Sequence, residues 1–316
     1  RPLPQMGRAV SISHEAMMKI AFLVLAHDRP SHLGRLLNAI CDEDCRAFVH
    51  IDAKSDITQF TLPPGANAQF TTRRIPVYWG EYSQVEAILH LIEEARFCED
   101  IEFDYFVLLS GADYPLVSLQ RVKSYFEAAQ NQIFIDTEKM PTETKPLKRL
   151  RDFVPSRDMP LRRKLFELSP PFLRTLVRRP YEKRLGPFVP HAGGTWWALP
   201  TRAIEHVTDV VKAHPEMVNF FKNTICPDEM FFQTILCSWC DIRQINPSLT
   251  YTDWSAGGNN PATIGQRHID ILKTDGELRK GRNNSGKIRS LFARKFPDDS
   301  QVLTQQISES RADRKI

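Results

Sequence analysis

The feature that most constrains the fold is an alternation of short apolar runs with amphipathic helical segments over the first 130 residues. The apolar runs have the length of buried strands and end in polar turns. They lie at residues 19–26 (KIAFLVLA), 46–52 (RAFVHID), 75–80 (IPVYWG) and 105–110 (YFVLLS). Apolar residues recur at helical spacing in segments 32–40, 83–96 and 119–129. Strands that alternate with helices predict an α/β fold with a mainly parallel sheet flanked by helices.

The length and composition fit a single large domain or two small ones. The chain has 316 residues, of which 42% are hydrophobic, so it can bury a sizeable core. A formal charge of +4 is too weak by itself to indicate nucleic acid. We expect one domain over residues 18–300. Residues 1–17 are expected to be an upstream or vector-derived tail, and residues 301–316 a polar tail that frays.

The sequence shows neither a membrane span nor a signal peptide. No run approaches 18 uninterrupted apolar residues, and the first residues lack an apolar core. Without a secretory signal, the six cysteines are expected to be reduced thiols of a cytoplasmic protein. Cys237 and Cys240 form a C-x-x-C pair, but no second pair or His cluster completes a zinc site. Small buried thiols are the simpler interpretation.

A basic segment at residues 145–184 interrupts the regular pattern. It holds 13 Lys or Arg against 4 Asp or Glu, with several prolines. One interpretation is a solvated, irregular insertion. The other is a lid or groove for an anionic ligand.

Two acids follow predicted strands, Asp52 and Asp113. Each could simply cap a turn, which is a common role for Asp. In a doubly wound sheet, however, both would face one crevice, and the pair Tyr78-Trp79 ends a third predicted strand. Together they favour a ligand crevice. Neither G-x-G-x-x-G nor G-x-x-x-x-G-K-[ST] occurs, so side chains or helix N-termini would have to hold any phosphate.

A second pair of acids, Asp228 and Glu229, directly follows Pro227 at a predicted helix start that runs to residue 237. Acids at this position complement the helix dipole without any function. Alternatively, one of them is a general base that accepts the proton of an attacking hydroxyl. The residue pattern leaves both interpretations open.

Further candidates are two cations and two tryptophans. Arg294 and Lys295 lie between apolar residues in LFARKF. They could occupy a surface turn or clamp a diphosphate. Trp196 and Trp197 in GGTWWALP could stack on sugar rings, although adjacent strand residues usually place one side chain in the core and one at the surface. With Asp228, they are the candidate substrate contacts.

Six sequence blocks together resemble the core-2/I-branching β-1,6-N-acetylglucosaminyltransferase and peptide O-xylosyltransferase family. The blocks are FVHIDAKS, VYWGEYSQVEA, FVLLSGADYPL, GGTWWALP, CPDEMFFQTIL and LFARKF, in family order between residues 19 and 296. The motifs YWG and FARKF are closer to the xylosyltransferase branch. The lack of a signal anchor is typical of a bacterial rather than a Golgi member. The resemblance implies a GT-A-type, Rossmann-like mixed sheet that binds a UDP-sugar at its carboxyl edge.

The resemblance also implies chemistry. The family inverts the anomeric carbon, forms a β-linkage and works without a metal or other cofactor. By similarity, Glu229 is the general base, and Lys295 with Arg294 stabilises the departing UDP. Asp52 and His27 are expected to contact the donor.

Three further residues are assigned to the donor by the same resemblance. Tyr78 and Trp79 match the aromatic wall near the uracil or ribose. Asp113 matches the acid near the donor sugar or pyrophosphate. UDP-xylose or UDP-N-acetylglucosamine is the expected donor. A further phosphate-binding arginine is left open among Arg267, Arg279 and Arg289.

The acceptor is expected to be a glycan or glycoconjugate hydroxyl. The basic segment 145–184 has no clear family counterpart, and its 13 cations would suit an anionic or lipid-linked acceptor or a peripheral contact with the inner face of the membrane. The alternative function is a non-catalytic binder of nucleic acid or another anionic polymer. That alternative leaves the six blocks unexplained, so no nucleic-acid partner is expected.

Overall fold

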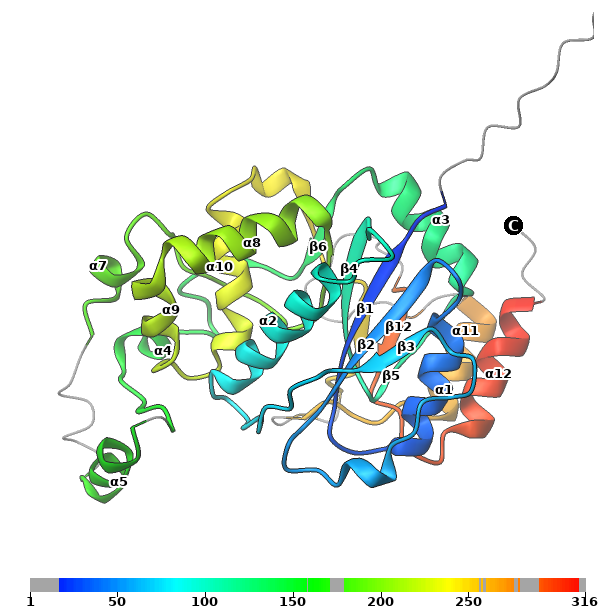
Figure 1. Cartoon of the computed structure of the whole chain (residues 1–316), viewed down its shortest axis with the longest axis horizontal. Helices are drawn as coiled ribbons and strands as arrows, with labels where there is room; N and C mark the ends of the chain where they lie inside the picture. The colour runs from blue at the N-terminus through cyan, green and yellow to red at the C-terminus, as the bar shows by residue number, and fades with distance from the viewer. Residues whose placement is uncertain are drawn as a thin grey trace, which may run out of the picture.

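The structure is a computed structural model that describes residues 17–157, 159–170, 179–255, 257, 260–275, 278 and 290–312. In this part of the chain, seven strands form a central sheet in the order β10-β6-β9-β4-β1-β2-β3 (Figure 1). They are β1 (Ile20–Ala26), β2 (Cys45–Ile51), β3 (Ala68–Phe70), β4 (Tyr105–Ser110), β6 (Ile133–Ile135), β9 (Trp197–Pro200) and β10 (Ile245–Asn246). Only β9 runs antiparallel to its neighbours, β4 and β6. The predicted α/β class with a mixed, mainly parallel sheet is therefore confirmed.

Helices cover both faces of the sheet (Figure 1). One face carries α2 (Ser83–Arg96), α8 (Thr201–Ala213), α9 (Pro215–Phe221) and α10 (Phe231–Cys237), and the other carries α1 (Pro30–Ile40) and α3 (Leu119–Ala129). Successive strand residues point to opposite faces, so Leu23 of β1 packs into the first core while Phe22 and Val24 pack into the second. Two apolar cores therefore sandwich the sheet.

A second, three-stranded sheet joins distant parts of the chain. It consists of β11 (Thr250–Thr252), β12 (Phe292–Arg294) and β5 (Asp113–Pro115), in that order. Beside it, α11 (Gln266–Asp275) and α12 (Gln301–Ala312) enclose a small third core that includes Tyr114 and Phe296. This sheet places Arg294, the last residue of β12, opposite Asp113 in β5, just after the turn that follows β4.

The expectation that the chain frays from residue 301 is wrong for residues 301–312, which form α12. Thr304 and Ile307 are buried, and Figure 1 shows α12 beside α1 and α11. Only a narrow stripe of side chains on this helix is buried, and the rest of its surface is polar. Because of that, its sequence resembles that of a polar tail. Of the predicted tails, residues 1–16 and 313–316 lie outside the described residues.

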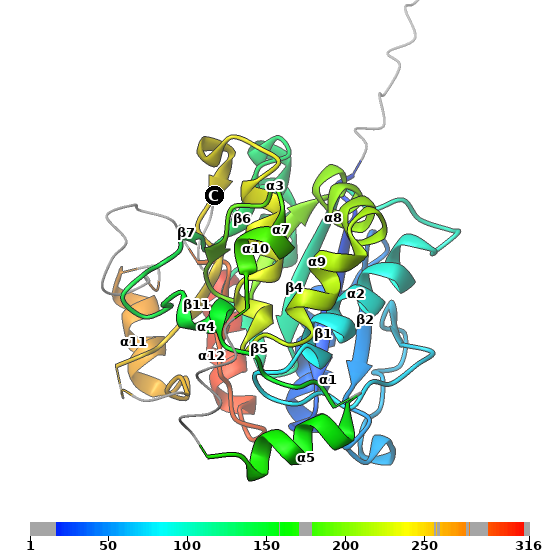
Figure 2. The ribbon, with the colours of Figure 1, turned by 90° about the vertical axis from the view of Figure 1, so that its left-hand side faces the viewer.

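Three short helices lie in the basic segment 145–184 or begin in it, within the part that the structure describes. They are α4 (Lys148–Arg151), α5 (Pro160–Leu168) and α7 (Tyr181–Leu185), and the short pair β7 (Glu138–Lys139) and β8 (His191–Ala192) flanks the segment (Figure 2). Residues 158 and 171–178 of the segment are outside the described part.

Two local predictions were wrong. Residues 75–80 form a loop beside Asp52, and β3 lies earlier in the chain. The predicted helix over 228–237 is divided into a 3₁₀ turn (Pro227–Glu229) and α10. Two other 3₁₀ turns cover Ile57–Gln59 and Ile242–Gln244. All six cysteines are free thiols, and burial raises the pKa of Cys237 and of Cys240.

Candidate active site

The candidate site lies where strand order reverses, between the carboxyl ends of β1 and β4. Parallel α/β sheets bind ligands at such switch points. The turn after β4 lies directly against β1, because the Gly111 amide donates to the Leu25 carbonyl at 2.8 Å. A Cβ atom on Gly111 would be 2.8 Å from the Cβ of Ala26, so this approach requires glycine.

Asp113 lies behind this edge rather than in an open crevice. Its side chain has no exposed surface and accepts hydrogen bonds from the Ser110 amide at 3.1 Å and from Arg294 Nε at 3.2 Å. Burial raises the pKa of Asp113, while the Arg294 guanidinium and the Ser110 hydrogen bonds oppose that rise. The expected direct contact of Asp113 with a donor does not agree with this position. The carboxylate instead holds Arg294 in place.

Three cations lie close to one another beside this edge: Arg294, Lys295 and Arg29. The Arg294 guanidinium lies 4.2 Å from the centre of the Trp196 ring. Lys295 is half-buried, and burial together with the positive charges of Arg294 and Arg29 lowers its pKa. Like charges kept this close create a site for an anion with several oxygens.

Arg29 was not anticipated from the sequence. It lies between β1 and α1 with φ of 60°, and its guanidinium pairs with Asp28 at 2.7 Å. The available signal was its place in the polar turn after the first strand. Of the arginines left open, Arg267 pairs with Asp253, whereas Arg279 and Arg289 lie outside the described residues.

Asp52 organises the loop at the end of β2. Its Oδ1 accepts from the Lys54 amide at 2.9 Å, and its Oδ2 pairs with Lys54 Nζ at 2.8 Å. Lys54 Nζ also lies 4.3 Å from the centre of the Tyr78 ring, and the Arg157 guanidinium lies 3.4 Å from the same ring. Asp52 therefore caps a turn, as the simpler interpretation held, and it also positions the Tyr78 loop.

Trp79 and His27 are the most exposed of the predicted donor contacts. Trp79 is 74% exposed, and the side chain of His27 is 67% exposed. His27 belongs to the turn after β1, and its carbonyl accepts from the Ser55 hydroxyl at 2.7 Å. Both side chains are accessible to a ligand at this edge of the sheet.

Glu229 and Asp228 have different environments. Glu229 is about a third exposed, and its Oε2 pairs with Arg149 at 2.6 Å and Lys145 at 3.2 Å. Among the described residues no hydrogen bond or ion pair uses Oε1. Asp228 is buried and accepts from Thr195 Oγ1 at 2.8 Å and from Gln84 Nε2 at 3.3 Å. Burial raises its pKa to about 6. The accessible carboxylate oxygen thus belongs to Glu229.

The two tryptophans have different roles. Trp196 is partly exposed and lies against Arg294, whereas Trp197 is 2% exposed and packs on Phe232 in the core. The assignment of Trp197 to substrate binding is therefore wrong, because its side chain is enclosed in the core. Thr195, Trp196 and their partners connect Asp228 to the cations.

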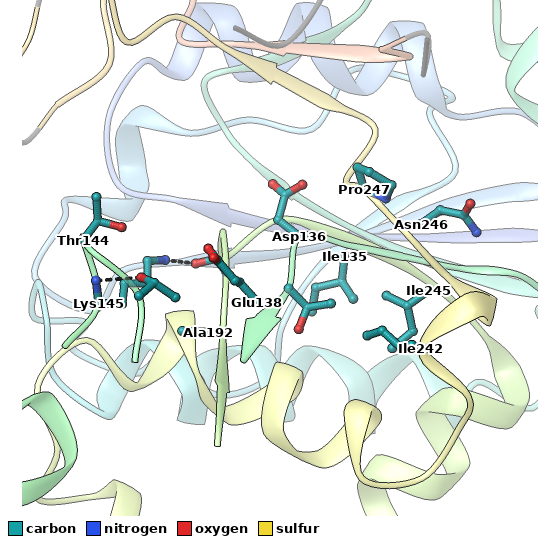
Figure 3. Close-up of a pocket in the computed structure, with 13 residues that line it drawn as sticks. Ile135, Asp136, Glu138, Thr144, Lys145, Ala192, Ile242, Ile245, Asn246 and Pro247 are labelled. Atoms are coloured by element: carbon teal, nitrogen blue, oxygen red, sulfur yellow. Dashed lines mark hydrogen bonds between the residues drawn. The ribbon is translucent and has the colours of Figure 1, made fainter. Parts of the chain in front are cut away.

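A pocket of about 310 Å³ is lined by Lys145 and Gly193, which both bond to Glu229. Figure 3 shows Asp136, Glu138, Lys145 and Asn246 around it. Lys145 Nζ donates a hydrogen bond to the Gly193 carbonyl. Its lining offers carboxylate, amide, hydroxyl and ammonium groups, which suit a ligand rich in hydroxyl groups.

Gly193 couples this pocket to Glu229. Its amide donates to the Glu229 carbonyl at 2.9 Å, and a Cβ atom would lie 1.6 Å from the Asp136 carbonyl oxygen. No side chain fits there, so the backbone of Gly193 packs directly against Asp136. Among the described residues, no group of three or more His, Cys, Asp or Glu could hold a metal ion.

Sequence comparison identifies the family. The profile of the Core-2/I-Branching enzyme family matches residues 20–275, which include all seven strands of the central sheet. The chain therefore belongs to this family, as the six blocks predicted.

Among curated relatives, the chain is similar to xylosyltransferases. It is 26% identical to Xylosyltransferase 1 of Canis lupus familiaris over 250 residues, covering 75% of this chain and 24% of that protein. It is 22% identical to Xylosyltransferase 2 of Homo sapiens over 247 residues, covering 75% of this chain and 27% of that protein. The chain thus spans about a quarter of the length of these relatives.

Proposed function

We propose that the chain is an inverting glycosyltransferase that moves a sugar from a UDP-sugar to a hydroxyl of a glycan or glycoconjugate. The observation that carries the proposal is the placement of an accessible carboxylate and a cation cluster on two sides of Thr195 and Trp196. Thr195 donates to Asp228, the neighbour of Glu229 in the sequence, and Trp196 lies against Arg294, the neighbour of Lys295. Membership of the Core-2/I-Branching enzyme family and similarity to xylosyltransferases support this proposal.

The proposed step is a direct displacement. The acceptor oxygen attacks the anomeric carbon as the bond from that carbon to the UDP oxygen breaks, which inverts an α-linked donor to a β-linkage. The acceptor proton passes to Oε1 of Glu229, while Arg149 and Lys145 hold Oε2. The negative charge that develops on the leaving diphosphate is stabilised by Arg294, Lys295 and Arg29.

In this scheme the leaving group needs no metal ion, because three cations already face it. Asp113 is a positioning residue for Arg294. We assign the nucleotide to the edge formed by His27, Tyr78 and Trp79.

We place the acceptor in the pocket beside Glu229, where its hydroxyl groups would meet Asp136, Glu138 and Asn246. Xylose and N-acetylglucosamine are the proposed donor sugars. Similarity to xylosyltransferases favours xylose.

The test of the base is Glu229→Gln. The variant keeps the shape of the side chain but cannot accept the proton, so transfer from UDP-xylose or UDP-N-acetylglucosamine should fall by about 10²–10⁴-fold. Thermal stabilisation by UDP should persist. Glu102→Gln, at an exposed position before β4, is the matched control and should keep full activity. Near wild-type transfer by Glu229→Gln would refute the assignment.

Chelation tests the metal-independent part of the proposal separately. Activity should be unchanged after dialysis against EDTA and on addition of manganese. Loss of activity in EDTA with recovery on manganese would show that the three cations do not stabilise the leaving group without a metal ion.

A further inference from the structure

Helix α5 carries an exposed apolar stripe that the fold does not use. Its leucine face consists of Leu161, Leu165 and Leu168, which are 78%, 69% and 74% exposed. Residues spaced by four and three positions lie on the same side of a helix. No residue of α5 is buried, so core packing does not hold this helix in position.

Basic side chains flank the leucine face. Arg162 and Lys164 are both exposed, and residues 145–184 as a whole hold 13 Lys or Arg against 4 Asp or Glu. Apolar residues on one side with cations beside them are typical of helices that lie in the headgroup region of a membrane. Arg162 and Lys164 are complementary to anionic headgroups, and the leucine face between them is complementary to acyl chains, so the combination favours an anionic lipid surface.

The position of α5 also fits a surface contact. In Figures 1 and 2 the helix lies at the outside of the molecule, on the side to which the carboxyl ends of β2 and β4 point. It is tied to the rest of the fold through Glu81, which pairs with Arg163 at 2.9 Å and with Arg157 at 3.0 Å. No described helix is long and apolar enough to cross a bilayer, so the contact would be peripheral.

We propose that α5 docks this protein onto the surface of an anionic lipid bilayer. The leucine face inserts at the boundary of headgroups and acyl chains, while Arg162 and Lys164 contact lipid phosphates. Docking by α5 would hold the candidate active site close to the membrane, where a lipid-linked glycan could present its hydroxyl. This last consequence rests on the proposed function, but the docking does not.

Vesicle flotation of the full chain tests the proposal. The protein should float with phosphatidylcholine vesicles that contain phosphatidylglycerol, bind pure phosphatidylcholine vesicles more weakly, and dissociate as salt is raised. The variant Leu161→Ser/Leu165→Ser/Leu168→Ser should bind the anionic vesicles at least about tenfold more weakly, because insertion of leucine side chains supplies the apolar part of the affinity. Its melting temperature should be unchanged, since the leucines are exposed.

The matched control is Ile271→Ser/Val302→Ser. These residues are 41% and 65% exposed and lie on α11 and α12, at the other end of the molecule (Figure 1). The control should bind like the wild type. Absence of binding to anionic vesicles at low salt, or equal binding by the leucine variant, would overturn the proposal. The proposal would also be overturned if the wild type were a dimer that binds no vesicles and the leucine substitutions made it monomeric. The leucine face would then join two copies of the chain.

Hydrolysis of the UDP-sugar in solution separates the two proposals. The leucine variant should retain it, because α5 does not contribute to the donor contacts. Vesicle binding without any hydrolysis or UDP stabilisation would contradict the proposed function and leave the docking intact.

Discussion

His32 joins parts of the chain that are far apart in sequence. The ring donates from Nε2 to the Asp113 carbonyl at 2.9 Å and accepts at Nδ1 from the Ser300 hydroxyl at 2.6 Å. It also stacks on Phe296 with a centroid distance of 5.4 Å. Burial lowers its pKa from 6.5 to about 4, so the ring is neutral in the folded protein at neutral pH.

This histidine should make stability depend on pH. Between pH 6.5 and 4 the unfolded chain binds a proton at His32 that the folded chain does not, so stability falls as the pH falls. The full loss attributable to this residue is on the order of 3 kcal/mol. In His32→Gln the slope of unfolding free energy against pH, measured by urea denaturation, should be smaller over this range.

The exposed His27→Gln is the control and should leave the slope unchanged. Burial also lowers the pKa of His50 to about 4. Every variant therefore keeps the part of the slope of unfolding free energy against pH that His50 contributes. Identical slopes in wild type and His32→Gln would contradict the assignment.

At the level of elements, α12 should contribute to stability as a core helix does. Ile307→Ala removes a side chain that is 1% exposed from the third core and should cost about 2–5 kcal/mol. Val302→Ala, at a residue of the same helix that is 65% exposed, should change stability by less than about 0.5 kcal/mol. Thermal or urea unfolding of the two variants measures the difference. Equal stability of the two would mean that α12 is not packed.

The elements that the sequence predicted well are those with strong local patterns. Strands β1, β2 and β4 are continuous apolar runs, and α2 and α3 have clear helical periodicity, so their bounds were predicted closely. The elements that were missed depend on partners far along the chain. Strand β12 exists only by pairing with β5 and β11, and α12 is held by α1 and α11.

The same distinction applies to the candidate site. Asp52 and Asp113 were indicated by their places after predicted strands, Glu229 by a predicted helix start and the family resemblance, and Arg294 and Lys295 by the apolar residues around them. Local pattern does not specify which of these side chains remain exposed. Only the fold shows that Asp113 is enclosed and that Arg29 joins the cations.

For the molecule as a whole, UDP should stabilise the folded state. A ligand at about 100 times its Kd adds roughly 2.7 kcal/mol to the unfolding free energy, which raises the melting temperature. Lys295→Ala should weaken UDP binding by about tenfold or more, because a hydrogen bond to a charged group contributes on the order of 1.5–3 kcal/mol. Differential scanning fluorimetry with UDP measures this change.

Uridine, which lacks the diphosphate, provides the control ligand for this measurement. Its effect should be the same on wild type and on Lys295→Ala. An equal loss for uridine and UDP would show that Lys295 supports the fold of the site and does not contact the diphosphate.

The pairing of β12 with β5 has a consequence for synthesis on the ribosome. The carboxylate of Asp113 and the sheet around it emerge about 180 residues before Arg294, the cation that pairs with it. Until β12 has been translated, folding the early strands would bury that carboxylate without its ion pair, at a cost in free energy. A nascent chain should therefore keep this edge of the sheet open, and the part of the site that contains Arg294 and Lys295 should form last.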